Sequence, residues 1–314
     1  MEIVILEPIG IKAINLAKIT ADFKELGCDL TFYANRPGND AEIIKRALNA
    51  DILVVSNLPI SEQLIHECKN LKMISVAFAG VDHIPMELCK KKNIVVSNAA
   101  GYSNHAVAEL VIGSAIHVYR KLNWCDQQTR KGLDRENFLG SELFGKTFGI
   151  IGLGQIGQEV AKLANAFGCN VIAFNKSSKN ISEVKQVDLE TLLKISDIVS
   201  IHVPLTTSTK ALIGKNELEL MKSTSILINT ARGAVVNYTE LKKALDENKL
   251  AGAAIDVYEK EPPLDKDYPL FNSANTILLP HIGYATEEAI QLRAEIVIEN
   301  IKKWLDGKPQ NMMN

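Results

Sequence analysis

Two kinds of apolar pattern alternate along nearly the whole chain. Short runs of β-branched residues are followed by longer stretches in which apolar residues recur every three or four positions. The first pattern is typical of strands buried on both faces, and the second is typical of amphipathic helices. Their regular alternation predicts an α/β protein whose parallel sheets are covered by helices on both sides.

The first part of the chain reads as five strand–helix units. One predicted helix runs from Ile11 to Leu26, and Gly27 supplies its expected stop. We expect the five strands at Glu2–Glu7, Asp29–Ala34, Asp51–Ser56, Leu71–Ala77 and Ile94–Asn98.

A second series of strands follows a junction. A long helical pattern from Ser103 to Leu122 leads into a polar stretch up to Gly145 that contains no convincing strand. Six further strands then fit a complete dinucleotide-binding sheet. They are expected at Phe148–Gly152, Asn170–Phe174, Asp197–Val203, Ser225–Ala231, Ala251–Tyr258 and Thr276–Pro280.

A last helix, from Thr286 to Leu305, follows the final strand and is expected to return to the first domain. The prediction is therefore a two-domain α/β protein in which a Rossmann dinucleotide-binding domain is inserted in a flavodoxin-like substrate-binding domain. The substrate-binding domain would comprise residues 1–99 plus 285–314, and the NAD(P)-binding domain residues 100–284.

Composition narrows the class of protein. The 314 residues include 46% hydrophobic and 23% charged residues, with a formal net charge of −2. This balance gives no general attraction to nucleic acid or to anionic lipid, so neither is expected as a partner. Residues 1–7 lack a basic, apolar leader pattern, and five widely spaced cysteines form no metal or disulfide pattern. We expect a cytoplasmic protein with reduced, mostly buried thiols and no metal.

A glycine-rich loop lies between the apolar strand 148–151 and the helical pattern 156–167. Gly152 permits the tight turn, Gly154 lets the backbone approach a pyrophosphate, and Gly157 allows close packing of helix on strand. With Gln155 and Ile156, these glycines are the candidate phosphate-binding residues, because the free N–H groups at a helix start attract anions. The alternative is a glycine-rich turn that binds no ligand.

The end of the next strand bears on the choice between NAD and NADP. An acidic residue there usually accepts hydrogen bonds from the adenosine ribose, but this chain has Asn175. Asn175 does not repel a 2′-phosphate, and Lys176 and Ser177 can donate hydrogen bonds to one. An Asn also binds a ribose hydroxyl and a loop Lys is often only solvated, so both cofactors remain open.

Four motifs in order, together with the glycine loop, resemble the D-isomer-specific 2-hydroxy acid dehydrogenases over nearly the full length. This family includes glycerate, lactate and phosphoglycerate dehydrogenases and glyoxylate/hydroxypyruvate reductases. The motifs are Ile201–Leu205, Leu227–Gly233, Asp256–Pro262 and Pro280–Gly283.

The resemblance implies that Arg232, Glu261 and His281 are the catalytic residues. Reduction of a carbonyl needs a proton donor that titrates near neutrality, which suits His281. A buried carboxylate that fixes the imidazole tautomer is the role assigned to Glu261. The forked charge of Arg232 suits the substrate carboxylate and carbonyl. Each residue alone is more often structural, but all three follow successive predicted strands, where such sheets bind ligands.

The resemblance also implies further contacts. Asp256 matches the residue that contacts the nicotinamide carboxamide. Phe78–His83 matches the substrate loop, in which Ala79 and Gly80 would bind the substrate carboxylate, although an ordinary turn requiring Gly80 is the alternative. Other predicted cofactor-binding residues are Val203, Pro204, Thr209, Thr230 and Ala231.

The predicted activity is hydride transfer between a nicotinamide cofactor and carbon 2 of a small 2-keto or D-2-hydroxy acid. Glyoxylate, hydroxypyruvate/glycerate and pyruvate/lactate are favoured. D-3-phosphoglycerate is an alternative, disfavoured because Asn57 stands where phosphoglycerate enzymes commonly have an Arg. Formate is disfavoured because that branch has Gln where this chain has Glu261. A dinucleotide-sensing, corepressor-like protein is an alternative of another class.

The resemblance further implies a homodimer formed through the cofactor domain, with the helix 103–122 as a candidate contact.

Overall fold

The computed structural model describes residues 1–11 and 13–314. The chain forms two compact units, one made of residues 1–103 and 285–314 and the other of residues 104–284. The helix predicted from Ile11 includes Lys12, which lies outside the described residues. The described helix, α1, spans Ala13–Glu25.

The first unit contains a parallel five-stranded sheet in the order β2-β1-β3-β4-β5. This is the strand order of flavodoxin-like folds. The strands are β1 Glu2–Ile5, β2 Asp29–Phe32, β3 Ile52–Val55, β4 Met73–Val76 and β5 Val95–Asn98, and the other helices are α2 Asp40–Ala47, α3 Glu62–Glu67, α4 Met86–Lys91 and α11 Glu287–Leu305.

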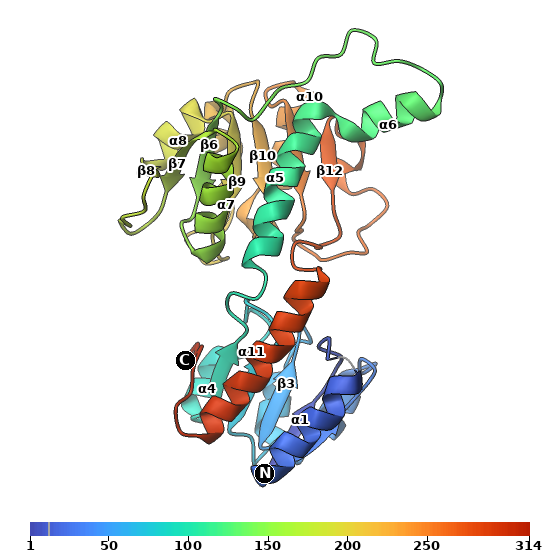
Figure 1. Cartoon of the computed structure of the whole chain (residues 1–314), viewed down its shortest axis with the longest axis vertical. Helices are drawn as coiled ribbons and strands as arrows, with labels where there is room; N and C mark the ends of the chain where they lie inside the picture. Colours follow the sequence, from blue (N-terminus) through green and yellow to red (C-terminus); the bar gives the residue numbers. More distant parts are fainter. Residues whose placement is uncertain (12) are drawn as a thin grey trace. The chain divides into compact units, whose positions relative to one another are not determined.

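Helices cover both faces of this sheet. Alternate strand residues such as Val4 and Leu53 pack with α2, α3 and α4 in one apolar cluster. Helix α11 lies along the opposite face, where Ser75 of β4 donates to the carbonyl oxygen of Val297 at 3.4 Å. Figure 1 shows α11, drawn in red, running alongside this sheet with α1 beside it.

The second unit contains a parallel seven-stranded sheet in the order β12-β11-β10-β9-β6-β7-β8. Taken from β6 onward, the order reads 3-2-1-4-5-6-7, the Rossmann arrangement with one added strand. The strands are β6 Thr147–Ile151, β7 Asn170–Phe174, β8 Lys185–Gln186, β9 Ile198–Ile201, β10 Ile226–Asn229, β11 Gly252–Ile255 and β12 Thr276–Leu278.

The predicted α/β class and its parallel sheets are confirmed, but the prediction of six strands in the second series is wrong. The missed strand is β8, which is only two residues long and therefore has no apolar alternation to detect. Most other strands are shorter than expected by one to four residues, whereas β6 is displaced by one residue and β7 has the expected bounds.

The central strands of this sheet are buried on both faces. Phe148 and Ile150 pack with α5 and α7, whereas Val199 and Leu227 pack with the helices of the other side. Figure 1 shows α5 and α7 next to each other on one face of the sheet. The helices of this unit are α5 Asn104–Arg120, α6 Leu122–Arg130, α7 Gln155–Ala166, α8 Leu189–Ile195, α9 Lys215–Leu220 and α10 Tyr238–Asp246.

The long helix predicted from Ser103 to Leu122 ends earlier than expected. Lys121 adopts a left-handed conformation with φ 44°, which breaks the chain into α5 and α6. Helix α6 occupies the stretch that the sequence presented as merely polar, and no α6 residue is buried. Without a buried face it has no apolar periodicity, which explains why the pattern missed it.

Most of the cysteines lie in the interior of the protein. All five are free thiols, four of them buried and Cys125 partly exposed. Burial raises the pKa of the Cys68 and Cys89 thiols to about 11.

Among the described residues, no cluster of three or more His, Cys, Asp or Glu is suited to a metal ion. In the same part of the chain, no helix combines the length and apolarity needed to cross a bilayer.

His202, just after β9, makes the stability of the second unit depend on pH. Its Nε2 lies 2.8 Å from the Ser200 hydroxyl, and desolvation lowers the pKa of the ring to about 3. An unfolded histidine binds a proton below about pH 6.5, so the unfolded state gains protons that the folded state does not. Stability is therefore lost as pH falls from 6.5 toward 3.

We expect His202→Gln to reduce this loss by about 1–2 kcal/mol between pH 7 and pH 5, measured by denaturant unfolding at each pH. The matched control is His105→Gln, because the side chain of His105 is 78% exposed. Identical acid dependence in the parent and in His202→Gln would contradict the assignment.

Candidate active site

The glycine loop between β6 and α7 has the geometry of a close backbone approach. Gly152 has φ 102°, and a Cβ there would lie 2.6 Å from the carbonyl oxygen of His202. A Cβ on Gly157 would overlap the carbonyl group of Gly152. Both positions therefore require glycine for packing, one because of the turn and the other because helix and strand touch.

Gly154 differs from both because a Cβ there would meet no atom within 4 Å. It caps α7 without a side-chain hydrogen bond, and Gln155 and Ile156 begin the helix. Backbone N–H groups at this terminus thus border open space, which fits the pyrophosphate of a dinucleotide. The residues present therefore fit the cofactor that the sequence indicated.

Asn175, at the end of β7, connects the glycine loop to the following loop. Its Oδ1 accepts from the Leu153 N–H at 3.0 Å, and its Nδ2 donates to the Ser177 carbonyl and hydroxyl oxygens at 2.8 and 3.2 Å. Lys179 donates from Nζ to the Leu153 carbonyl oxygen at 2.8 Å, whereas Lys176 is exposed. Lys179 was not among the predicted cofactor residues, because its contact with Leu153 joins positions that are 26 residues apart along the chain.

The loop after β9 carries three of the predicted cofactor residues. Thr209 donates from its hydroxyl to the Pro204 carbonyl oxygen at 2.6 Å, and this contact holds the turn that follows Val203. After the neighbouring strand β10, the Thr230 hydroxyl is buried and has no hydrogen-bond partner among the described residues. A buried unpaired hydroxyl is costly unless a ligand completes it, so Thr230 also fits a cofactor site.

The turn after β10 presents Arg232. Asn229, fully buried, accepts from the Ala231 N–H at 3.1 Å and donates to the Arg232 carbonyl oxygen at 3.0 Å. The Asn229 amide also donates to the Tyr238 hydroxyl at 2.9 Å, and that hydroxyl donates to the Val257 carbonyl oxygen at 2.7 Å. These bonds fix the backbone of Arg232 relative to the segment after β11. The sequence motif contained Asn229, but its residue type alone did not reveal this bracing role.

His281 and Glu261 meet, as the sequence predicted. The imidazole Nδ1 lies 3.0 Å from Glu261 Oε2. The prediction that this carboxylate is buried is wrong, because the Glu261 side chain is 53% exposed. The reason is its position on the long segment between β11 and β12, outside the apolar core of the second unit.

Asp256 holds the turn that carries His281. The Asp256 carboxylate is 1% exposed and accepts from the Ile282 and Gly283 N–H groups at 2.7 and 2.8 Å. Burial raises the pKa of Asp256, while those two hydrogen bonds and the nearby His281 act in the opposite direction. His281 itself has φ 56°, an uncommon conformation for a residue with a side chain. Both carboxylate oxygens of Asp256 thus accept hydrogen bonds that shape this turn. The contact of Asp256 with nicotinamide stays a prediction.

The first unit contributes the loop predicted to bind the substrate carboxylate. This loop follows β4 and is braced by the end of β5, since the Asn98 amide donates to the Ala79 carbonyl oxygen at 2.7 Å. The Ala99 N–H donates to the Phe78 carbonyl oxygen at 3.0 Å. Ala79 is exposed and Gly80 is partly exposed. The loop therefore has a fixed backbone at the carboxyl end of its sheet.

Known proteins resemble this chain over most of its length. Residues 112–283 match the family model described as the D-isomer specific 2-hydroxyacid dehydrogenase, NAD binding domain. The chain is 40% identical over 282 residues to a glyoxylate reductase of Thermococcus litoralis, covering 86% of this chain and 84% of that protein. It is 41% identical over 281 residues to a D-3-phosphoglycerate dehydrogenase of Methanocaldococcus jannaschii. That match covers 87% of this chain but 53% of the relative, so the chain spans about half of its length.

A solved structure is similar over the whole chain. It is described as an acyclic imino acid reductase in complex with NADPH and D-Arg, with a TM-score of 0.92, 35% identity and complete coverage of both chains. The family match spans more than half of this chain, and the glyoxylate reductase match spans most of both proteins. The protein therefore belongs to the NAD(P)-dependent D-isomer specific 2-hydroxyacid dehydrogenases, as its ordered motifs indicated.

Proposed function

We propose that this chain interconverts a small 2-keto acid and its D-2-hydroxy acid, with Arg232, Glu261 and His281 as catalytic residues. Glyoxylate, hydroxypyruvate and pyruvate are the first substrates to test. The observation that carries this proposal is the 3.0 Å contact between His281 Nδ1 and Glu261 Oε2. A carboxylate on one ring nitrogen fixes the tautomer and assigns proton exchange with the substrate to Nε2.

The nicotinamide, when bound, supplies the hydride for reduction or takes it in oxidation. During reduction, His281 donates a proton from Nε2 to the carbonyl oxygen as negative charge develops there. During oxidation, the same nitrogen accepts the hydroxyl proton. Glu261 keeps the imidazole oriented and stabilises its charged form.

Arg232 has a different task because its guanidinium keeps its charge throughout the reaction. It binds the substrate carboxylate and polarises the carbonyl, which orients carbon 2 for hydride transfer. The bracing by Asn229 and Tyr238 supports this role, since an arginine that orients a substrate needs a fixed backbone.

We also infer a division of labour between the two units. The unit of residues 104–284 is the NAD(P)-binding domain, in which Gly152, Gly154 and Gly157 form the phosphate loop. Val203, Pro204, Thr209, Thr230 and Ala231 line the rest of the cofactor site. The other unit is the substrate-binding domain, in which the backbone of Ala79 and Gly80 binds the substrate carboxylate.

For the cofactor, we propose a preference for NADP over NAD. Asn175 replaces the acidic residue that would repel a 2′-phosphate, and its side chain is engaged with Leu153 and Ser177. The exposed Lys176 and the amine of Lys179, held 2.8 Å from the Leu153 carbonyl oxygen, bring two positive charges to this loop. Two cations and a serine hydroxyl are donors suited to a phosphate group.

We further propose a cytoplasmic homodimer that pairs through the second unit. Helix α6 has no buried residue, and the following segment exposes Leu133, Leu139 and Phe144. Figure 1 shows α6 extending away from the sheet of its own unit. Apolar residues on a projecting segment are typical of a subunit contact. The free cysteines suit a reducing compartment.

The function is tested by following oxidation of NADPH and NADH at pH 7 with the three acids. We expect the parent to oxidise the reduced cofactor with at least one acid at a rate typical of a metabolic enzyme. We expect His281→Ala to lower kcat by about a hundredfold or more. His66→Ala, on the exposed surface of α3, is the control and should match the parent.

In the same assay, Arg232→Ala should raise KM for the acid and lower kcat, with little change in cofactor affinity.

An unaltered rate in His281→Ala would remove that residue from the mechanism. Loss of cofactor affinity alone in Arg232→Ala would contradict the substrate role. Tight cofactor binding without turnover of any acid would instead support a dinucleotide-sensing protein.

The cofactor preference is tested with the double variant Lys176→Ala/Lys179→Ala. We expect its KM for NADPH to rise about tenfold or more while KM for NADH changes less than about twofold, because only NADPH carries the 2′-phosphate. Lys194→Ala on α8, ion-paired with Glu190, controls for the loss of surface charge. Equal changes in the two KM values would overturn the preference.

A further inference from the structure

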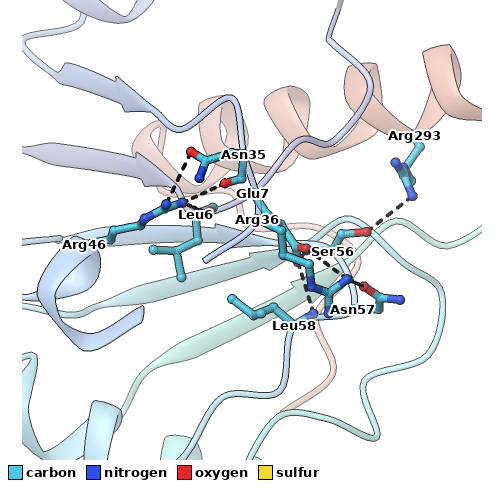
Figure 2. Close-up of polar contacts among 9 residues, drawn as sticks. All are labelled: Leu6, Glu7, Asn35, Arg36, Arg46, Ser56, Asn57, Leu58 and Arg293. Carbon is cyan, nitrogen blue, oxygen red and sulfur yellow. Dashed lines mark hydrogen bonds and ion pairs between the residues drawn. The ribbon is translucent and has the colours of Figure 1, made fainter. Parts of the chain in front are cut away.

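A polar network joins the carboxyl ends of three neighbouring strands in the first unit. Glu7 follows β1, Arg36 follows β2, and Ser56 and Asn57 follow β3. Figure 2 shows these side chains converging from the ends of their strands, with Arg293 of α11 reaching the same group. Open parallel sheets bind their ligands at this edge.

Arg46 stabilises the turn that carries Arg36. This buried guanidinium donates from Nη1 to the carbonyl oxygens of Leu6 and Asn35 at 3.0 and 2.7 Å. Its Nη2 donates to the Asn35 side chain at 3.3 Å and also contacts Glu42. Arg46 therefore ties the end of β1 to the residue immediately before Arg36.

Glu7 fixes the other side of the network. The residue is 3% exposed, and its Oε1 accepts from the Ser56 and Leu58 N–H groups at 2.8 and 3.0 Å. Its Oε2 lies 3.5 Å from Arg36 Nη1. The carboxylate thus joins the ends of β1 and β3 and helps to position the Arg36 side chain.

The Arg36 guanidinium, unlike that of Arg46, keeps N–H donors that are available to a ligand. The Arg36 side chain is 50% exposed, and Nη1 also donates to Asn57 Oδ1 at 2.7 Å. Among the described residues, both polar contacts of the Arg36 side chain, with Asn57 and with Glu7, use Nη1. The Nε and Nη2 donors are therefore available on a side chain whose backbone turn is fixed.

A second cation increases the positive charge of this edge. Arg293 is 5% exposed and donates from Nη1 to the Ser56 hydroxyl at 3.4 Å, and its guanidinium carbon lies 5.7 Å from the centre of the Phe78 ring. Phe78 begins the loop that contains Ala79 and Gly80. The network therefore extends from the turn of Arg36 toward the proposed carboxylate loop of the same unit.

We propose that Arg36 is a specificity-determining residue that binds a second anionic group, a carboxylate or a phosphate, at the far end of the 2-keto acid. This role rests on the proposed function, because it takes the first carboxylate to lie at Ala79 and Gly80. Arg36 reaches Asn57 at the end of β3, and β3 pairs directly with β4. Neighbouring strands lie about 4.8 Å apart, which is about the separation of the two anionic groups in a four- or five-carbon acid.

The position of Arg36 changes what Asn57 implies about the substrate. The sequence disfavoured D-3-phosphoglycerate because Asn57 stands where phosphoglycerate enzymes commonly have an arginine. In the structure a guanidinium nevertheless lies beside Asn57, because Arg36, on the turn after β2, donates to Asn57 Oδ1 at 2.7 Å. The Asn57 side chain accepts from this cation and orients it.

The test compares pairs of acids with the same number of carbon atoms. One member of each pair carries the second anionic group and the other lacks it. The pairs are 2-oxoglutarate with 2-oxopentanoate and 3-phosphohydroxypyruvate with hydroxypyruvate. We expect the parent to prefer the dianionic acid in at least one pair, which distinguishes carboxylate from phosphate. Arg36→Gln should lower kcat/KM for that acid about ten- to hundredfold, mainly through KM, and change kcat/KM for its partner less than about twofold.

Two further variants separate charge recognition from a structural effect. Lys45→Gln removes an exposed positive charge from α2 of the same unit and should change neither acid. Arg36→Lys keeps a cation beside Glu7 but loses the fork, so it should recover part of the lost discrimination even where Arg36→Gln folds poorly. An equal fall for both acids of a pair, or unchanged discrimination, would overturn the role of Arg36. Turnover of none of the acids would contradict the proposed function itself.

Discussion

The proposed chemistry depends on one contact, between the imidazole of His281 and the carboxylate of Glu261. Each residue lies on a loop beyond the end of its strand, so the contact exists only because β11 and β12 are neighbours in the sheet. The turn is maintained by Asp256, whose buried carboxylate accepts the two N–H groups that follow His281. A backbone with φ 56° at His281 would be unfavourable without such support. A buried acid thus shapes the turn on which the proposed proton donor stands.

The same physical rule organises both units. In a parallel sheet all carboxyl ends lie at one edge, so loops distant in sequence become neighbours there. In the second unit this edge carries the glycine loop, Thr230 and the turn of Arg232. In the first unit it carries the loop of Ala79 and the network around Arg36. The fold thus gathers the candidate groups of each unit at one edge, while their chemistry comes from the loops.

Features that depend on strong local patterns were predictable from sequence. Buried strands and amphipathic helices identified the two parallel sheets, and the ordered motifs identified the family. The glycine loop was also readable, because its spacing reports the physical demands of a turn and a close approach. Strand β8 and helix α6 were not predictable, since the first is too short for a pattern and the second buries no residue.

Side-chain contacts between separate loops were the least accessible from sequence. The reach of Arg36 to Asn57 and of Lys179 to Leu153 depends on how turns bend. The exposure of Glu261 was misjudged for a related reason, because the burial of a loop carboxylate is set by what packs over it. Residue type indicated the chemistry of these groups, whereas only coordinates gave their surroundings.

The role of the Glu261 carboxylate is tested by a single-turnover measurement of hydride transfer in Glu261→Gln, with enzyme and reduced cofactor in excess over a 2-keto acid. Glu259→Gln is the matched control, because Glu259 is also exposed and instead accepts from the Tyr268 hydroxyl at 2.8 Å. We expect Glu261→Gln to slow the transfer about tenfold or more, while Glu259→Gln stays within about twofold of the parent. Equal rates in the two variants would show that the carboxylate beside His281 takes no part in the reaction.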